Sequence, residues 1–210
     1  MSELLKHLYY NRKNIFSTKR LIQAILVATW LAMLIATYSF AVIYATTPGA
    51  RGHSPADWPE KSVLVRDSSR PTLITFIHPK CSCSRATLNE LNKIVSHCPD
   101  RLKVYILMLV PRGEGKDWAK TDLLDSARAI PGAEVRFDME GQEANRFHSL
   151  TSGHTLVYLP SGELVFNGGI TASRGHEGDN KGQSTIEDIA RGRSEKLWFN
   201  QVFGCPLKER

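Results

Sequence analysis

Two cysteines separated by one residue, Cys81 and Cys83, are the side chains of this sequence best suited to do chemistry. They follow an apolar run at residues 73–77 and a proline, and they precede apolar residues at helical spacing. The pattern predicts that a strand ends just before the two thiols and that a helix begins directly after them. Unpaired N–H groups and the helix dipole at such a position favour the thiolate, which attacks disulfides and binds soft metal ions. We therefore expect a thiol site at an exposed strand-to-helix junction.

Strand and helix patterns alternate through the rest of the chain. The sequence predicts a helix at 84–96, a strand at 102–110, a helix at 117–129, a strand at 134–138, a helix at 140–150, hairpin strands at 155–159 and 163–167, and a last helix from about residue 185. This order joins a βαβ half to a ββα half. It predicts an α/β sandwich, in which helices flank a central mixed sheet of parallel strands with an antiparallel edge pair.

The N-terminal region predicts one transmembrane helix ahead of this sandwich. Residues 21–45 contain no Asp, Glu, Lys or Arg, and at ~1.5 Å per residue they are long enough for the ~30 Å core of a bilayer. The apolar part of a signal peptide is usually only ~7–15 residues long, so we expect an uncleaved anchor. Residues 46–62 are rich in Pro and Gly and are expected to link the anchor to a domain at 63–210.

The distribution of charge predicts how the chain is oriented. The tail at residues 1–20 carries five Lys and Arg residues against one acid, which places it in the cytoplasm by the positive-inside rule. The protein is thus expected in the cytoplasmic (inner) membrane, with its large domain on the periplasmic, extracytoplasmic side. The net charge is +6, of which the tail supplies 5 − 1 = +4, so the remaining chain is nearly balanced and gives no reason to expect nucleic acid. In an oxidising compartment a close cysteine pair is either a redox couple or a metal site.

Two longer segments resemble a known superfamily. Residues 137–170 read FDMEGQEANRFHSLTSGHTLVYLPSGELVFNGGI, and residues 76–91 read FIHPKCSCSRATLNEL. Together they resemble membrane-anchored thioredoxin-like proteins of the TlpA/ResA kind. The shorter segments HPKCSCSRA and GGITASRGHEGDN resemble proteins labelled RedB. The resemblance implies a thioredoxin-like fold, thiol–disulfide chemistry without a cofactor, and protein thiols or disulfides as partners.

The sequence departs from the thioredoxin pattern at two places. Ser84 stands where the second cysteine of Cys-x-x-Cys would be, and Cys83 lies one residue earlier. His154 stands where thioredoxins carry a cis-proline that faces the disulfide. Ordinary thioredoxin activity is therefore not implied by the resemblance alone.

The first hypothesis is a thiol–disulfide oxidoreductase with Cys81 as the attacking thiol and Cys83 as the resolving thiol. A disulfide between residues so close in sequence closes a small ring, and strained disulfides are more easily reduced. Lys80 and Arg85 are expected to favour the thiolate. Further residues are expected at the rim of the site: His78, Lys80, Ser84, Arg85, His154, Arg174 and His176. Arg174 and His176 belong to a glycine-rich segment, 168–184, which should lie beside the cysteines.

Two alternatives remain at this stage. Cys81, Cys83 and His154 could bind Cu(I), an arrangement that resembles Sco-type copper chaperones and implies a metalloprotein assembly partner, such as a respiratory or cytochrome complex. The chain could instead be a noncatalytic, membrane-anchored interaction domain. Cys98 follows the first helix and is expected to be structural. Cys205 could resolve a disulfide at Cys81 or pair with Cys98.

Overall fold

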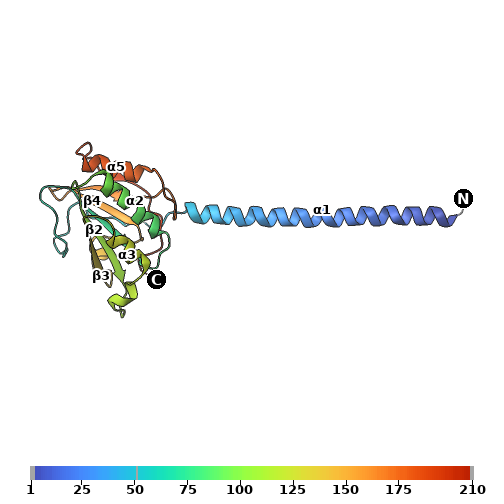
Figure 1. Ribbon diagram of the computed structural model, residues 1–210, viewed down its shortest axis with the longest axis horizontal. Helices are drawn as coiled ribbons and strands as arrows, with labels where there is room; N and C mark the ends of the chain where they lie inside the picture. Colours follow the sequence, from blue (N-terminus) through green and yellow to red (C-terminus); the bar gives the residue numbers. More distant parts are fainter. Residues whose placement is uncertain (1–2, 51, 209–210) are drawn as a thin grey trace. The chain divides into compact units, whose positions relative to one another are not determined.

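A mixed sheet of six strands forms the centre of the globular unit, Ala45–Arg210 (Figure 1). In this computed structural model, residues 3–50 and 52–208 are described. The strands are β1 (Thr72–Ile77), β2 (Lys103–Val110), β3 (Ala133–Met139), β4 (His154–Tyr158), β5 (Leu164–Gly168) and β6 (Trp198–Phe199). Their spatial order is β3-β2-β1-β4-β5-β6. Neighbouring strands among β1, β2 and β3 are parallel, whereas β4 is antiparallel to both β1 and β5.

Apolar side chains on both faces of the sheet explain why its central strands are buried throughout. Leu73 and Ile77 point to one face, which is covered by α2 (Ser84–His97), α3 (Asp122–Arg128) and α5 (Lys181–Ala190). Ile74 and Phe76 point to the other face, where α4 (Gln142–Arg146) contributes Phe147 just beyond its end. Because successive side chains of a strand alternate between faces, a strand covered on both sides is apolar at nearly every position. The predicted α/β sandwich with a central mixed sheet is confirmed.

The helix predicted at 117–129 is wrong as a single element. The structure has a short 3₁₀ helix, η1 (Lys116–Ala119), followed by the separate helix α3. Between them, Thr121 is in an extended conformation, and its hydroxyl donates a hydrogen bond to the carbonyl of Pro79 at 3.0 Å. This contact to the loop that carries the cysteines interrupts the helix.

Two other helix boundaries differ from the prediction. Helix α5 begins at Lys181 rather than near residue 185, because the side chain of Asn180 accepts a hydrogen bond from the N–H of Gln183. Helix α4 is shorter than the predicted 140–150. At its start, the carboxylate of Asp138 accepts hydrogen bonds from two backbone N–H groups. The helix ends at Arg146, and the chain turns two residues later at His148, which has a positive φ of 52°. Both differences arise from side-chain capping and turn geometry.

The segment expected to be a linker is packed on the globular unit. The N–H of Gly49 donates to the carbonyl of Val202 at 2.8 Å, and the hydroxyl of Thr151 donates to the carbonyl of Ala50 at 2.7 Å. Further along, the ring of Trp58 packs edge-on against Phe147. This part of residues 46–62 therefore belongs to the folded unit rather than acting as a free spacer.

Helix α1 (Glu3–Thr46) precedes the globular unit and contains one segment, Thr18–Thr46, that is long and apolar enough to cross a membrane. Large apolar side chains along it, such as Leu26, Ile35 and Phe40, are exposed. A helix that is apolar on all sides is typical of a membrane-spanning segment, although a signal sequence near an N-terminus has the same character. The predicted tail at 1–20 begins with two residues outside the described part of the chain and is otherwise helical.

Candidate thiol site

The two neighbouring cysteines lie in the turn that joins β1 to α2. After Ile77, the N–H of Cys81 donates to the carbonyl of His78 at 3.0 Å, and the N–H of Ser84 donates to the carbonyl of Cys81 at 3.0 Å. Cys83 is the N-cap residue of α2. The sequence therefore placed the strand end, the thiols and the helix start correctly.

The expected exposure of this pair is wrong. The exposed fraction is 1% for Cys81 and 8% for Cys83. At Cys81 a segment distant in sequence lies against the sulfur, because the backbone N–H and the thiol of Cys205 both hydrogen-bond to it. A third cysteine thus lies against the predicted attacking thiol, and Cys205 itself is half-buried.

The C-terminal segment reaches this position by pairing with the loop before β4. The N–H of Ser152 donates to the carbonyl of Cys205 at 2.8 Å, and the N–H of Leu207 donates to the carbonyl of Leu150 at 2.9 Å. Thr151 and Pro206 form an antiparallel bridge between these bonds. The loop before β4 is therefore the support that holds Cys205 beside Cys81.

Hydrogen bonds to the sulfur of Cys81 decide its protonation. Burial alone raises the pKa of Cys81, but donors from Ser84, from the backbone and side chain of Cys205, and from the backbone of Cys83 outweigh it and lower the pKa below its ordinary value. The hydroxyl of Ser84 also lies 2.7 Å from that of Ser152, which accepts the N–H of His78 at 2.7 Å. The contact with Ser152 thus holds the hydroxyl of Ser84 in place beside the Cys81 sulfur.

The other two thiols at the site are held in the protonated form. Burial and the negative charge of Cys81 raise the pKa of Cys83, and the guanidinium of Arg174 offsets part of this effect. Burial and the hydrogen bond to Cys81 raise the pKa of Cys205. The arrangement is one ionisable sulfur accepting hydrogen bonds from its neighbours, which suits Cys81 to nucleophilic attack.

Arg174, which the sequence predicted at the rim of the site, makes two contacts there. Its guanidinium hydrogen-bonds to Cys83 and donates to the carbonyl of Gly204. It therefore connects the cysteine turn with the C-terminal segment. His176, from the same glycine-rich segment, is exposed and lies in a turn closed by a bond from its N–H to the carbonyl of Ser173.

The basic residues next to the cysteines contact other partners. The ammonium of Lys80 lies 4.1 Å from the centre of the Trp118 ring, and Arg85 forms an ion pair with Asp122. The ring of His78 packs edge-on against Trp118 at 5.5 Å. The dominant effects on the pKa of Cys81 come instead from burial, Ser84, Cys205 and Cys83.

His154 occupies a buried position on β4 and uses both ring nitrogens. Nδ1 lies 2.6 Å from the hydroxyl of Ser149, and Nε2 lies 2.7 Å from the side-chain oxygen of Asn167. It could bind a metal ion only by giving up one of these bonds. Within residues 3–50 and 52–208, no group of three His, Cys, Asp or Glu side chains is arranged to hold a metal ion.

Cys98 lies apart from the site, where the chain leaves α2. It is buried in the core between the sheet and α5, with its sulfur 4.0 Å from the carbonyl of Glu187. Burial raises its pKa. These surroundings support the structural role expected from the sequence.

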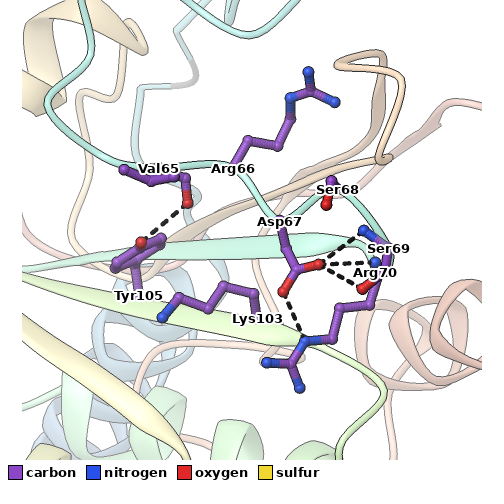
Figure 2. A pocket seen from close by; sticks show the side chains of 8 residues that line it. All are labelled: Val65, Arg66, Asp67, Ser68, Ser69, Arg70, Lys103 and Tyr105. Carbon is purple, nitrogen blue, oxygen red and sulfur yellow. Dashed lines mark hydrogen bonds and ion pairs between the residues drawn. The ribbon is translucent and has the colours of Figure 1, made fainter.

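A shallow cavity of about 470 Å³ lies at the other end of the sheet (Figure 2). It is lined by the loop 65–70 together with Lys103 and Tyr105. Lys103 begins β2, whereas the cysteine turn follows the end of the parallel strand β1, so the cavity is remote from the thiols. Figure 2 shows that the carboxylate of Asp67 points back into its own loop, where it accepts bonds from Ser69 and Arg70.

Sequence reasoning missed the contributions of Ser152 and Gly204. The signal for Gly204 was present in the run Phe203–Gly204–Cys205–Pro206, because a glycine beside a cysteine permits close backbone approach. A side chain at Gly204 would overlap the backbone oxygen of Ser152. Ser152 gave no comparable signal, since its role depends on the docked segment.

Comparisons with known proteins address the fold. No family model matches the sequence, and a search of curated proteins found no relative. Among solved structures, an uncharacterized conserved protein from Geobacillus kaustophilus matches with a TM-score of 0.56 and 14% identity, over 79% of this chain and 93% of its own. A hypothetical protein from Sinorhizobium meliloti 1021 matches with a TM-score of 0.52 and 14% identity, over 78% and 96%.

The strand arrangement matches the predicted thioredoxin-like fold. A parallel β1–α2–β2 unit lies beside an antiparallel β4–β5 hairpin followed by a helix, and the hairpin pairs with β1. The globular unit has the thioredoxin-like fold. An exposed lipoprotein thioredoxin, Etrx1 from Streptococcus pneumoniae, has a TM-score of 0.41 and 15% identity over 60% of this chain and 86% of its own. At such identities the comparisons describe the fold only, and none supports the narrower RedB resemblance.

Proposed function

We propose that this protein is a membrane-anchored thiol–disulfide oxidoreductase whose attacking group is the thiolate of Cys81. The observation that carries the proposal is the set of hydrogen bonds directed at the Cys81 sulfur, which lower its pKa although the residue is buried. Because the thiolate is the reactive form, selective stabilisation of one thiolate among three thiols defines the nucleophile. The fold contributes only the position of Cys81, in the turn between β1 and α2.

The reaction begins with attack of the Cys81 thiolate on one sulfur of a partner's disulfide. A bond forms between Cys81 and that sulfur, the partner's S–S bond breaks, and the second partner sulfur leaves as a thiolate that takes a proton from solvent. A second thiol of this chain, either Cys83 or Cys205, then loses its proton to solvent and attacks the Cys81 sulfur. The mixed disulfide breaks, the partner is released with both sulfurs reduced, and this chain holds the new disulfide.

The location that fits this chemistry is the extracytoplasmic face of the cytoplasmic membrane. The apolar segment Thr18–Thr46 supports an anchor, and the basic residues of the tail support a cytoplasmic N-terminus. The partners would then be exported proteins with thiols or disulfides, metalloprotein assembly factors among them. RedB-like identity remains a prediction from the sequence.

The test uses the full-length reduced chain in detergent with glutathione disulfide. We expect release of free glutathione. We also expect transient attachment of one glutathionyl group to Cys81, which peptide mass spectrometry locates. Cys81→Ser should abolish the release, whereas Cys98→Ser should leave it unchanged. Equal release from Cys81→Ser and wild-type protein would overturn the assignment of the nucleophile, and absence of release from wild-type protein would overturn the function.

The copper and interaction-domain alternatives receive no specific support. His154 already has hydrogen-bond partners on both ring nitrogens, so the proposed Cys81, Cys83 and His154 ligand set would need rearrangement. Titration of the reduced protein with Cu(I) tests the copper alternative directly. Affinity that is the same in wild-type protein and in the Cys81→Ser, Cys83→Ser double variant would exclude the predicted ligands.

A further inference from the structure

The C-terminal segment 202–207 is anchored on both sides of Cys205. Val202, Phe203 and Leu207 are buried, with exposed fractions of 1%, 8% and 3%. Cys205 and Leu207 each form a backbone hydrogen bond with the loop 150–152. Cys205 is therefore held at a defined place beside Cys81 rather than at the end of a free tail.

Two further features fit this segment closely to the site. Gly204 passes so near Ser152 that any larger residue would overlap the Ser152 carbonyl oxygen. The guanidinium of Arg174 bonds to the Gly204 carbonyl and to Cys83, so one side chain connects the segment with the cysteine turn. Both contacts fix the backbone directly beside Cys205.

We propose that the segment 202–207 is a tethered internal partner of the thiol site, which covers the sulfur of Cys81 and supplies Cys205 as the thiol that closes a disulfide with it. The inference deepens the proposed function and rests on it. It assigns the resolving step to Cys205 and not to Cys83, which the sequence favoured. It also makes displacement of the segment a requirement for reaction with any external disulfide, since Cys81 is covered while the segment is docked.

Geometry favours Cys205 over Cys83. The thiol of Cys83 also hydrogen-bonds to Cys81, but a disulfide between residues two apart would close a small ring that departs from relaxed geometry. Cys83 is fixed as the N-cap of α2 with helical backbone angles, and its sulfur is engaged by Arg174 as well. Cys205 instead approaches Cys81 from a distant part of the chain, with both its N–H and its thiol directed at the Cys81 sulfur. A disulfide to Cys205 would therefore not impose the strain of a small ring.

The charge on Cys81 sets the order of the two steps. Burial raises the pKa of Cys205, and while Cys81 is a thiolate its hydrogen bond and negative charge raise that pKa further. Once Cys81 enters a mixed disulfide, the contribution of its charge is gone and the pKa of Cys205 falls, which favours loss of its proton to solvent and attack on the Cys81 sulfur. The Cys81–Cys205 bond forms, the bond from Cys81 to the external sulfur breaks, and that sulfur leaves as a thiolate.

The experiment treats the reduced full-length chain in detergent with glutathione disulfide and maps all disulfides by peptide mass spectrometry. It compares wild-type protein with Cys83→Ser, Cys205→Ser and the control Cys98→Ser. We expect a Cys81–Cys205 disulfide in wild-type protein, Cys83→Ser and Cys98→Ser. In Cys205→Ser we expect glutathione to remain attached to Cys81, with a lifetime on the order of tenfold longer than in wild-type protein, because the attacking thiol is missing.

The outcomes separate this inference from the function on which it rests. A Cys81–Cys83 disulfide in wild-type protein, or resolution in Cys205→Ser as fast as in wild-type protein, would overturn the role of Cys205 and leave the oxidoreductase intact. Failure of Cys81 to react in any of these proteins would overturn the function itself. Circular dichroism of each variant checks that the fold is retained.

Discussion

At the scale of single residues, Ser84 makes the largest contribution among the groups that lower the pKa of Cys81. Its hydroxyl donates to the Cys81 sulfur and occupies the position where a Cys-x-x-Cys motif would carry its second thiol. Hydrogen bonds to the thiolate lower the pKa of a thiol, whereas burial raises it. At the second cysteine position of the motif, the structure therefore has a hydroxyl that donates a hydrogen bond to Cys81 in place of a second thiol.

The pH dependence of alkylation tests the role of Ser84. The rate at Cys81 should follow the thiolate fraction, with a midpoint below the ordinary thiol pKa of about 8.5. Ser84→Ala removes a donor to a charged sulfur, worth ~1.5–3 kcal/mol, so the midpoint should rise by ~1–2 pH units and the rate at neutral pH should fall. Iodoacetamide labelling, quantified at the Cys81 peptide, measures both.

The control for this experiment is Ser126→Ala, which removes a hydroxyl that bonds to the carbonyl of Asp122 within α3. Its alkylation profile at Cys81 should match that of wild-type protein. An unchanged midpoint in Ser84→Ala would mean that the hydroxyl does not stabilise the thiolate.

Ser84→Cys should redirect the disulfide. The introduced thiol would lie in the first turn of α2, in contact with Cys81, and would compete with Cys205 for the mixed disulfide. We expect oxidation by glutathione disulfide to give mainly a bond between Cys81 and the introduced thiol, with Cys205 left as a thiol that iodoacetamide labels after denaturation. Ser126→Cys should leave the pairing of Cys81 as in wild-type protein. Persistence of the Cys81–Cys205 bond in Ser84→Cys would contradict the expected competition.

Residue patterns were enough to place the thiols, but not to assign their partners. An apolar strand, a proline and a helical repeat located Cys81 and Cys83 correctly, because local periodicity determines where elements begin and end. The contacts of Lys80 with Trp118 and of Arg85 with Asp122 depend on how α2, η1 and α3 pack. Long charged side chains can reach several partners, so adjacency to a cysteine in sequence does not identify the group that such a side chain contacts.

At the scale of elements, the site is a contact between three segments far apart in sequence. The turn between β1 and α2 carries Cys81. The segment 202–207 covers Cys81, and the loop 150–152 holds that segment in place. The sequence located the first and allowed Cys205 to reach Cys81, but it did not reveal the supporting loop. Backbone pairing between the other two is a long-range contact with no local signature.

Gly204→Val should open the site by displacing the C-terminal segment. A valine side chain would overlap the Ser152 carbonyl, so the segment should leave the loop 150–152. Native-state labelling of Cys81 by iodoacetamide at high pH, where the thiol is fully ionised, should then rise ~10-fold or more, because access no longer depends on local opening.

A matched control exists for this substitution. A Cβ atom added at Gly115 would have no neighbour within 4 Å, and the φ of −92° at this position suits any residue. Gly115→Val should therefore leave labelling of Cys81 unchanged. Equal labelling of Gly204→Val and wild-type protein would show that the segment does not control access.

At the scale of the whole molecule, the sequence predicted the fold but not the extent of the globular unit. Alternating strands and helices were enough for the α/β sandwich, because their order allows few topologies. The stretch rich in Pro and Gly suggested a free spacer, yet Gly49, Ala50 and Trp58 contact the globular unit. Composition indicates that a segment lacks helix or strand, and does not indicate whether it packs.

The anchor gives the last prediction, which concerns topology. With an uncleaved span at Thr18–Thr46 and a basic cytoplasmic tail, the full-length chain should stay in the membrane after alkaline washing and keep its N-terminal peptides. Lys61→Cys, at an exposed position of the globular unit, should react with a membrane-impermeant maleimide in intact spheroplasts of a bacterial host. Lys13→Cys should react only after lysis, because the excess of Lys and Arg holds the tail inside. Release of a shortened chain would identify a signal sequence, and the reverse labelling pattern would place the thiol site in the reducing cytoplasm, where a stable Cys81–Cys205 disulfide would not persist.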